Sequence, residues 1–87
     1  MKKESKLKAE PFDKELEKLL TNMGKRMQEL RKKKGYKNYE LFAFENELPR
    51  AQYGRYERGQ DLKVSSLLKV VRGYGMTLQE FFSEGFE

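Results

Sequence analysis

The 87-residue sequence contains no cysteine and no histidine. Without cysteine the chain has no disulfide framework and no thiolate ligand for a metal. Without histidine it lacks the commonest general base and a common zinc ligand. It also has no glycine-rich loop of the kind that cradles a phosphate. These absences predict that the protein is not an enzyme and that it uses no metal and no other cofactor.

Long apolar runs are missing as well. No segment approaches the ~18 consecutive apolar residues that a membrane-spanning helix requires. The lysines near the N-terminus are not followed by the apolar stretch of a secretory signal. No alternating strand pattern and no internal repeat is visible. We therefore expect a single all-α domain that is cytoplasmic and has no membrane partner.

Positive charge is what the chain has in excess, with a formal net charge of +5 and a pI of about 9.5. Residues 1–35 carry twelve Lys or Arg against six Asp or Glu, whereas residues 36–87 carry seven against eight. A basic domain attracts polyanions by electrostatic steering and counterion release. The same charge is also compatible with a well-solvated surface that binds nothing.

The apolar spacing predicts six helical segments. Residues 1–11 are lysine-rich and are expected to be a flexible basic N-terminus. An extra N-terminal helix follows in residues 12–22, capped by Asp13 and ending near Leu20. A second segment runs from Asn22 to Lys34, because Asn and Gly at positions 22 and 24 disfavour a helix interior.

The remaining helices show start and stop signals. Asn38 is a good N-cap for a helix that ends near Asn46 or Glu47. An amphipathic helix begins at Val64 and ends at the glycines 73 and 75. Thr77, with Glu80 three residues later, has the capping-box pattern of a last short helix, and residues 84–87 are expected to form a tail.

The stretch from Leu48 to Gly59 predicts a short helix whose exposed face carries small residues and arginines. On a helical wheel Tyr53, Tyr56 and Glu57 share one face, and the opposite face carries Ala51, Gly54, Arg55 and Arg58. A face of small residues and arginines suits entry into a groove and binding to guanine or phosphate. The glycine costs about 1 kcal/mol of helix stability relative to alanine. We interpret it as a point of close approach, either to DNA or to the preceding helix.

Residues 23–83 carry a set of short motifs at regular spacing. The string Arg55-Tyr56-Glu57-Arg58-Gly59 is followed by Leu67-Leu68-Lys69-Val70, Gly75-Met76-Thr77-Leu78 and Glu80-Phe81-Phe82; earlier matches are Gly24-Lys25-Arg26-Met27, Leu30-Arg31, Gly35, Phe42-Ala43, Leu48, Arg50 and Tyr53. Together they resemble the Cro/XRE helix-turn-helix family of phage-repressor-like regulators. Two positions depart from the family pattern: Glu47 stands in place of the usual corner glycine, and Pro49 in place of a Ser or Thr cap.

The resemblance implies a five-helix lambda-repressor-like DNA-binding domain in residues 23–83, preceded by the extra N-terminal helical segment. It implies a sequence-specific transcriptional regulator of the repressor type that binds double-stranded DNA as a homodimer. The recognition helix, Arg50–Arg58, would lie in the major groove. Bases would be contacted by Arg50, Ala51, Gln52 and Arg55, and an Arg31–Glu57 ion pair would be structural. Phosphate contacts are expected from Asn38, Tyr39, Arg58, Gln60 and Lys63.

The apolar stripe from Phe12 to Met23 leaves a second interpretation open. The stripe could cover the core, or it could form an interface with another protein. In the second case the chain would be an antitoxin-type interaction module that binds a toxin-type partner protein and its own operator. Tyr53, Tyr56, Phe42 and Phe81 are expected in the core. Single-stranded nucleic acid is therefore a less suitable ligand, because no exposed aromatic stacking platform is expected.

Overall fold

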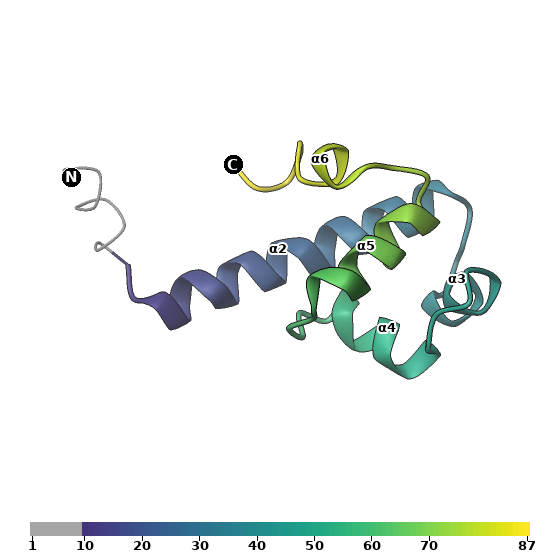
Figure 1. Ribbon diagram of the computed structural model, residues 1–87, viewed down its shortest axis with the longest axis horizontal. Helices are drawn as coiled ribbons and strands as arrows, with labels where there is room; N and C mark the ends of the chain where they lie inside the picture. The colour runs from purple at the N-terminus through teal and green to yellow at the C-terminus, as the bar shows by residue number, and fades with distance from the viewer. Residues whose placement is uncertain (1–9) are drawn as a thin grey trace.

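The computed structural model describes residues 10–87, which form an all-α fold (Figure 1). No strand occurs in this part of the chain, which confirms the expected fold class. Apart from Glu10 and Pro11, the expected flexible N-terminus lies outside the described residues. The helices are α2 (Phe12–Lys33), α3 (Tyr39–Glu45), α4 (Arg50–Glu57), α5 (Val64–Gly73) and α6 (Leu78–Phe81).

The long helix α2 is continuous over 22 residues, so the predicted division into segments 13–20 and 22–34 is wrong. The glycine that suggested a break serves a contact instead. A Cβ at Gly24 would lie 2.5 Å from the backbone oxygen of Glu57 in α4. Packing against α4 therefore outweighs the low helix propensity of this position. The predicted cap is wrong too: the N-cap is Pro11, which has no side-chain cap, and Asp13 lies in the first turn.

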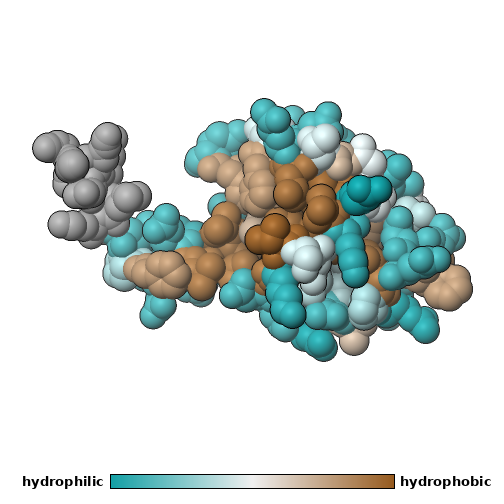
Figure 2. Space-filling view, in the orientation of Figure 1, coloured by the Kyte–Doolittle hydropathy of each residue, from teal (hydrophilic) through white to brown (hydrophobic). Residues whose placement is uncertain are grey.

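The first half of α2 projects beyond the other helices (Figure 1). The molecule therefore extends 46 Å along its longest axis and only 22 and 21 Å along the two shorter axes. Phe12 is 73% exposed and Leu19 is 41% exposed, whereas Met23 is buried. The core therefore engages α2 from Leu20, which is partly buried against it, and Met23 onward. Figure 2 shows the resulting apolar surface along the projecting half of this helix.

An aromatic cluster forms the centre of the core. The ring of Phe42 lies 5.0 Å from those of Tyr53 and Tyr74 and 5.3 Å from that of Tyr36. Phe42 and Phe81 are fully buried, as expected from their positions in the sequence. The buried apolar residues are Met23, Met27, Leu30, Phe42, Ala43, Tyr53, Tyr56, Leu67, Val70, Val71, Tyr74 and Phe81.

The two other predicted helix caps, at Asn38 and Thr77, are present. The side chain of Asn38 accepts a hydrogen bond from the backbone N–H of Leu41 at 2.8 Å. Thr77 and Glu80 form a reciprocal capping box at the start of α6. These signals were visible in the sequence because a cap is made by residues that are only a few positions apart.

Residues 84–87, which we expected to be a tail, return to the core. The guanidinium of Arg26 in α2 donates to the backbone oxygen of Phe81 at 2.8 Å and to that of Glu80 at 3.0 Å. It also contacts the carboxylate of Glu84 at 3.5 Å. The ring of Phe86 lies 5.9 Å from that of Phe81. The C-terminal segment is therefore fastened to α2.

Candidate nucleic-acid interface

The candidate interface is the outer side of α4, which follows α3 after the turn formed by residues 46–49. Tyr53, Gly54, Tyr56 and Glu57 are buried. The four residues predicted to contact bases are all exposed, and they are Arg50, Ala51, Gln52 and Arg55. The helix therefore presents two arginines, an amide and a small side chain to solvent on a backbone that the core holds in place.

Gly54 is not on this outer side, so its predicted place beside Ala51 and Arg55 is wrong. It is buried, and a Cβ there would lie 2.4 Å from the ring of Tyr39 in α3. The glycine thus permits close approach to the preceding helix, which was one of its two interpretations. Because α4 packs against both α2 and α3, its buried arc is wider than a helical wheel with one buried face predicts.

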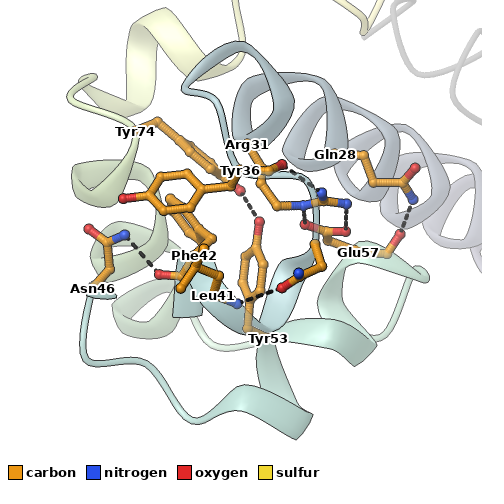
Figure 3. A network of polar contacts seen from close by, with 10 residues as sticks. Gln28, Arg31, Tyr36, Leu41, Phe42, Asn46, Tyr53, Glu57 and Tyr74 are labelled. Carbon is orange, nitrogen blue, oxygen red and sulfur yellow. Dashed lines mark hydrogen bonds and ion pairs between the residues drawn. The ribbon is translucent and has the colours of Figure 1, made fainter. Parts of the chain in front are cut away.

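A buried ion pair fixes the C-terminal end of α4, as the resemblance implied. The Arg31 guanidinium donates to both carboxylate oxygens of Glu57, at 2.8 and 2.9 Å (Figure 3). Arg31 also donates to the backbone oxygen of Tyr36 at 3.1 Å, and Gln28 donates to that of Glu57 at 3.0 Å. The bond to the carboxylate raises the pKa of Arg31 above its ordinary value. This bidentate geometry sets both the position and the rotation of α4 against α2.

A second polar contact joins α4 to the C-cap residue of α5, Tyr74. The hydroxyls of Tyr53 and Tyr74 lie 2.8 Å apart inside the core (Figure 3). Burial raises the pKa of both tyrosines above the ordinary value. Sequence reasoning assigned Tyr53 to the core but missed this hydroxyl pair, since no local pattern links residues 21 positions apart.

The predicted phosphate contacts come from two segments, one before and one after α4. Asn38 and Tyr39 lie at the start of α3, where the amide oxygen of Asn38 is engaged as the cap and Tyr39 is half-buried over Gly54. Beyond α4, the exposed Arg58 and Gln60 line one surface hollow of about 330 Å³ together with Arg55. Lys63 is exposed and forms the N-cap position of α5.

One neighbour of this surface was missed at the sequence level. The guanidinium carbon of Arg50 lies 5.8 Å from the centre of the Phe44 ring. Phe44 is in the last turn of α3 and is 65% exposed. An exposed phenylalanine just before a turn gives no signal by itself, because single exposed apolar residues are common on protein surfaces.

Residues 10–87 offer neither a metal cluster nor a membrane-spanning helix. No group of three or more carboxylates that could hold a metal ion is found there. None of the helices in that range is both long and apolar enough to cross a membrane. A scan against protein-family models, a search of curated proteins and a search of solved structures each found no match to this chain.

Proposed function

We propose that this protein is a sequence-specific transcriptional regulator of the Cro/XRE type, which binds double-stranded DNA as a homodimer. The observation that supports the proposal best is the two-sided construction of α4. Its inner side is held against α2 by the Arg31–Glu57 pair, against α3 by the Tyr39–Gly54 contact and at the C-cap of α5 by the Tyr53–Tyr74 hydroxyl pair. Its outer side carries exposed arginines with no structural task of that kind.

The chemistry of that outer side suits the major groove. An arginine can donate two hydrogen bonds to O6 and N7 of guanine, which is worth about 1–3 kcal/mol of discrimination per base pair. In the proposed complex Arg50 and Arg55 read guanines, Gln52 reaches a base or a nearby phosphate, and Ala51 contacts a thymine methyl group. A helix that is held rigidly presents these groups in one fixed register.

Phosphate contacts position the helix in this proposal. At the start of α3, beside Asn38 and Tyr39, the N-terminal end of the helix dipole favours an anion, although the Leu41 N–H is taken by the Asn38 cap. On the other side of α4, Arg58, Gln60 and Lys63 flank the groove. Such contacts carry no sequence information, but they set register and make binding depend on salt.

The test is selection from randomised DNA duplexes at two salt concentrations. Wild type should enrich an inverted repeat that contains guanine, with half-sites about 34 Å apart. Arg55→Ala should relax the preference at one position of each half-site. Arg72→Ala is the matched control, because Arg72 is also exposed but lies in the last turn of α5. Equal loss of binding in both variants, with no sequence enriched by wild type, contradicts the proposal.

A second candidate function rests on the projecting half of α2. Its apolar stripe is exposed, with Phe12 and Leu19 at 73% and 41%. Residues 10–20 carry four acidic and two basic side chains, so this segment repels nucleic acid. An apolar stripe beside acidic side chains fits a protein partner whose apolar groove is edged by Lys or Arg. We propose an antitoxin-type interaction module as the alternative.

The discriminating variant is Phe12→Ser combined with Leu19→Ser. Lys14→Ser combined with Lys18→Ser is the matched control, since both residues are exposed in the same turns and neither is apolar or acidic. The candidate is supported if a purified partner binds wild type and the control but not the apolar variant. It fails if the partner binds all three chains equally. A change in mass of the isolated chain, measured by sedimentation velocity, instead assigns the stripe to a second copy.

A further inference from the structure

The arginines of α2 and α4 have different surroundings. Arg31 and Arg26 are buried, and their N–H groups are taken by the Glu57 carboxylate and by backbone oxygens near the C-terminus. Arg50 is exposed, and no hydrogen bond or ion pair to its guanidinium is found among residues 10–87. Its recorded neighbour is the ring of Phe44, 5.8 Å from the guanidinium carbon.

Phe44 has no place in the core that would explain an aromatic residue. The buried residues of α3 are Phe42 and Ala43, and Phe44 is 65% exposed. The short turn between α3 and α4 brings the last turn of α3 next to the first residue of α4, which is Arg50. The ring therefore lies beside the side chain that opens the candidate recognition helix.

A ring and a carboxylate restrain an arginine in different ways. A carboxylate takes the N–H donors of the guanidinium in bidentate hydrogen bonds and neutralises its charge. An aromatic face attracts the cation through its quadrupole, and the N–H donors at the guanidinium edge stay free. Phe44 can thus limit the motion of Arg50 without occupying the donors that a guanine would need.

We propose that Phe44 is a specificity-determining positioning residue, which holds the Arg50 guanidinium so that its N–H groups face a guanine in the major groove. This inference rests on the proposed function, because Arg50 must read a base for its orientation to matter. Ordering the side chain before binding lowers the conformational entropy lost in the complex. The wrong base gains nothing from this, since it lacks the paired acceptors.

The test uses the operator that wild type selects and a second duplex with 7-deazaguanine at the base pair whose preference is lost in Arg50→Ala. Phe44→Leu keeps the apolar bulk and removes the aromatic face, and Phe44→Tyr keeps the face. Phe44→Leu should reduce the discrimination between the two duplexes by about 2- to 5-fold. Phe44→Tyr should match wild type. In the Arg50→Ala background Phe44→Leu should change nothing at this base pair.

A measurement without DNA checks the geometry. Ring currents should shift the Arg50 side-chain protons upfield in the NMR spectra of wild type and of Phe44→Tyr, and Phe44→Leu should abolish this shift. The inference is overturned if Phe44→Leu keeps full discrimination, or if it weakens every DNA sequence alike. Either result for Phe44→Leu overturns this inference alone when wild type selects an operator and Arg55→Ala relaxes the base preference. The proposed function then stands. If wild type selects no operator, both are overturned.

Discussion

Glu47 is the non-glycine residue with positive φ in the described chain, at +57°. It follows α3 in a helix-ending turn in which Leu48 N–H bonds to the Ala43 oxygen and Glu47 N–H bonds to the Phe44 oxygen. Turns of the same pattern end α2, α4 and α5, and there the equivalent residues are Gly35, Gly59 and Gly75. A residue with a Cβ in this conformation costs about 1–2 kcal/mol. Glu47 therefore stores strain at the corner before the candidate recognition helix.

We predict that Glu47→Gly raises the free energy of unfolding by about 0.5–1 kcal/mol, since the relief of strain exceeds the entropy that glycine adds to the unfolded chain. Urea unfolding followed by circular dichroism measures this change. Glu40→Gly is the control, because Glu40 lies within α3 and has helical backbone angles. Glu40→Gly should lower the free energy of unfolding, because glycine weakens a helix interior. If both variants lower it equally, the corner is not strained.

The buried ion pair of Arg31 and Glu57 should contribute more to stability than an exposed ion pair does. The two side chains are 7% and 5% exposed. Glu57→Gln leaves a buried guanidinium without its carboxylate, which should lower the free energy of unfolding by about 3–5 kcal/mol. Glu10→Gln breaks the exposed contact with Lys18, at 32% and 69% exposure, and should lower it by less than about 1 kcal/mol. If urea unfolding shows similar losses of stability for Glu57→Gln and Glu10→Gln, burial does not decide how much an ion pair contributes.

At the scale of the element, the two halves of α2 have different roles. Its second half is the base on which α4 is set, and Gly24 is the crossing point. We predict that Gly24→Ala lowers the free energy of unfolding by about 1–3 kcal/mol, because the new Cβ would meet a backbone oxygen at 2.5 Å. Helix propensity alone predicts a gain of about 1 kcal/mol. Thr21→Ala, at an exposed position one turn earlier, should follow propensity, so the opposite signs in thermal unfolding separate the two effects.

The first half of α2 lacks a comparable support. Amide hydrogens near residues 16–20 should exchange faster than those near residues 26–31, because exposed turns open locally without unfolding the domain. Hydrogen exchange at several protein concentrations measures this difference. Protection of residues 16–20 that rises with concentration would instead mean that a second copy covers the stripe.

At the scale of the whole molecule, the buried tyrosines couple folding to pH. The pKa values of Tyr53 and Tyr74 are raised by burial, so the folded state keeps both phenols neutral. Their contribution to stability is complete below the ordinary tyrosine pKa of about 10 and is lost as pH rises above it, since the unfolded chain then ionises first. Urea unfolding from pH 8 to 11 should show stability falling at the alkaline end.

Tyrosinate absorbance supplies the check on this prediction. The signal of Tyr53 and Tyr74 should appear together with the loss of the helical circular dichroism signal, and Tyr74→Phe should reduce the dependence of stability on pH. Ionisation of all five tyrosines in one step near pH 10, with the helices intact, would contradict the buried environment.

The sequence by itself determined the parts that depend on near neighbours. The caps at Asn38 and Thr77, the end of α5 at the glycines 73 and 75 and the inward tyrosines of α4 could be predicted, because each involves residues within a few positions of one another. The Arg31–Glu57 pair could be predicted only because the spacing of these two residues resembles that of a known family. The residues proposed to contact DNA follow from the same spacing together with the helical period.

Only the tertiary structure decided the contacts between distant segments. It made α2 continuous through Gly24, covered Gly54 with Tyr39, paired the hydroxyls of Tyr53 and Tyr74, and set Phe44 beside Arg50. It also left the Phe12–Leu19 face uncovered. A propensity measures what a residue prefers alone, and packing against another helix can outweigh that preference by several kcal/mol. Which helix lies opposite is a property of the assembled chain.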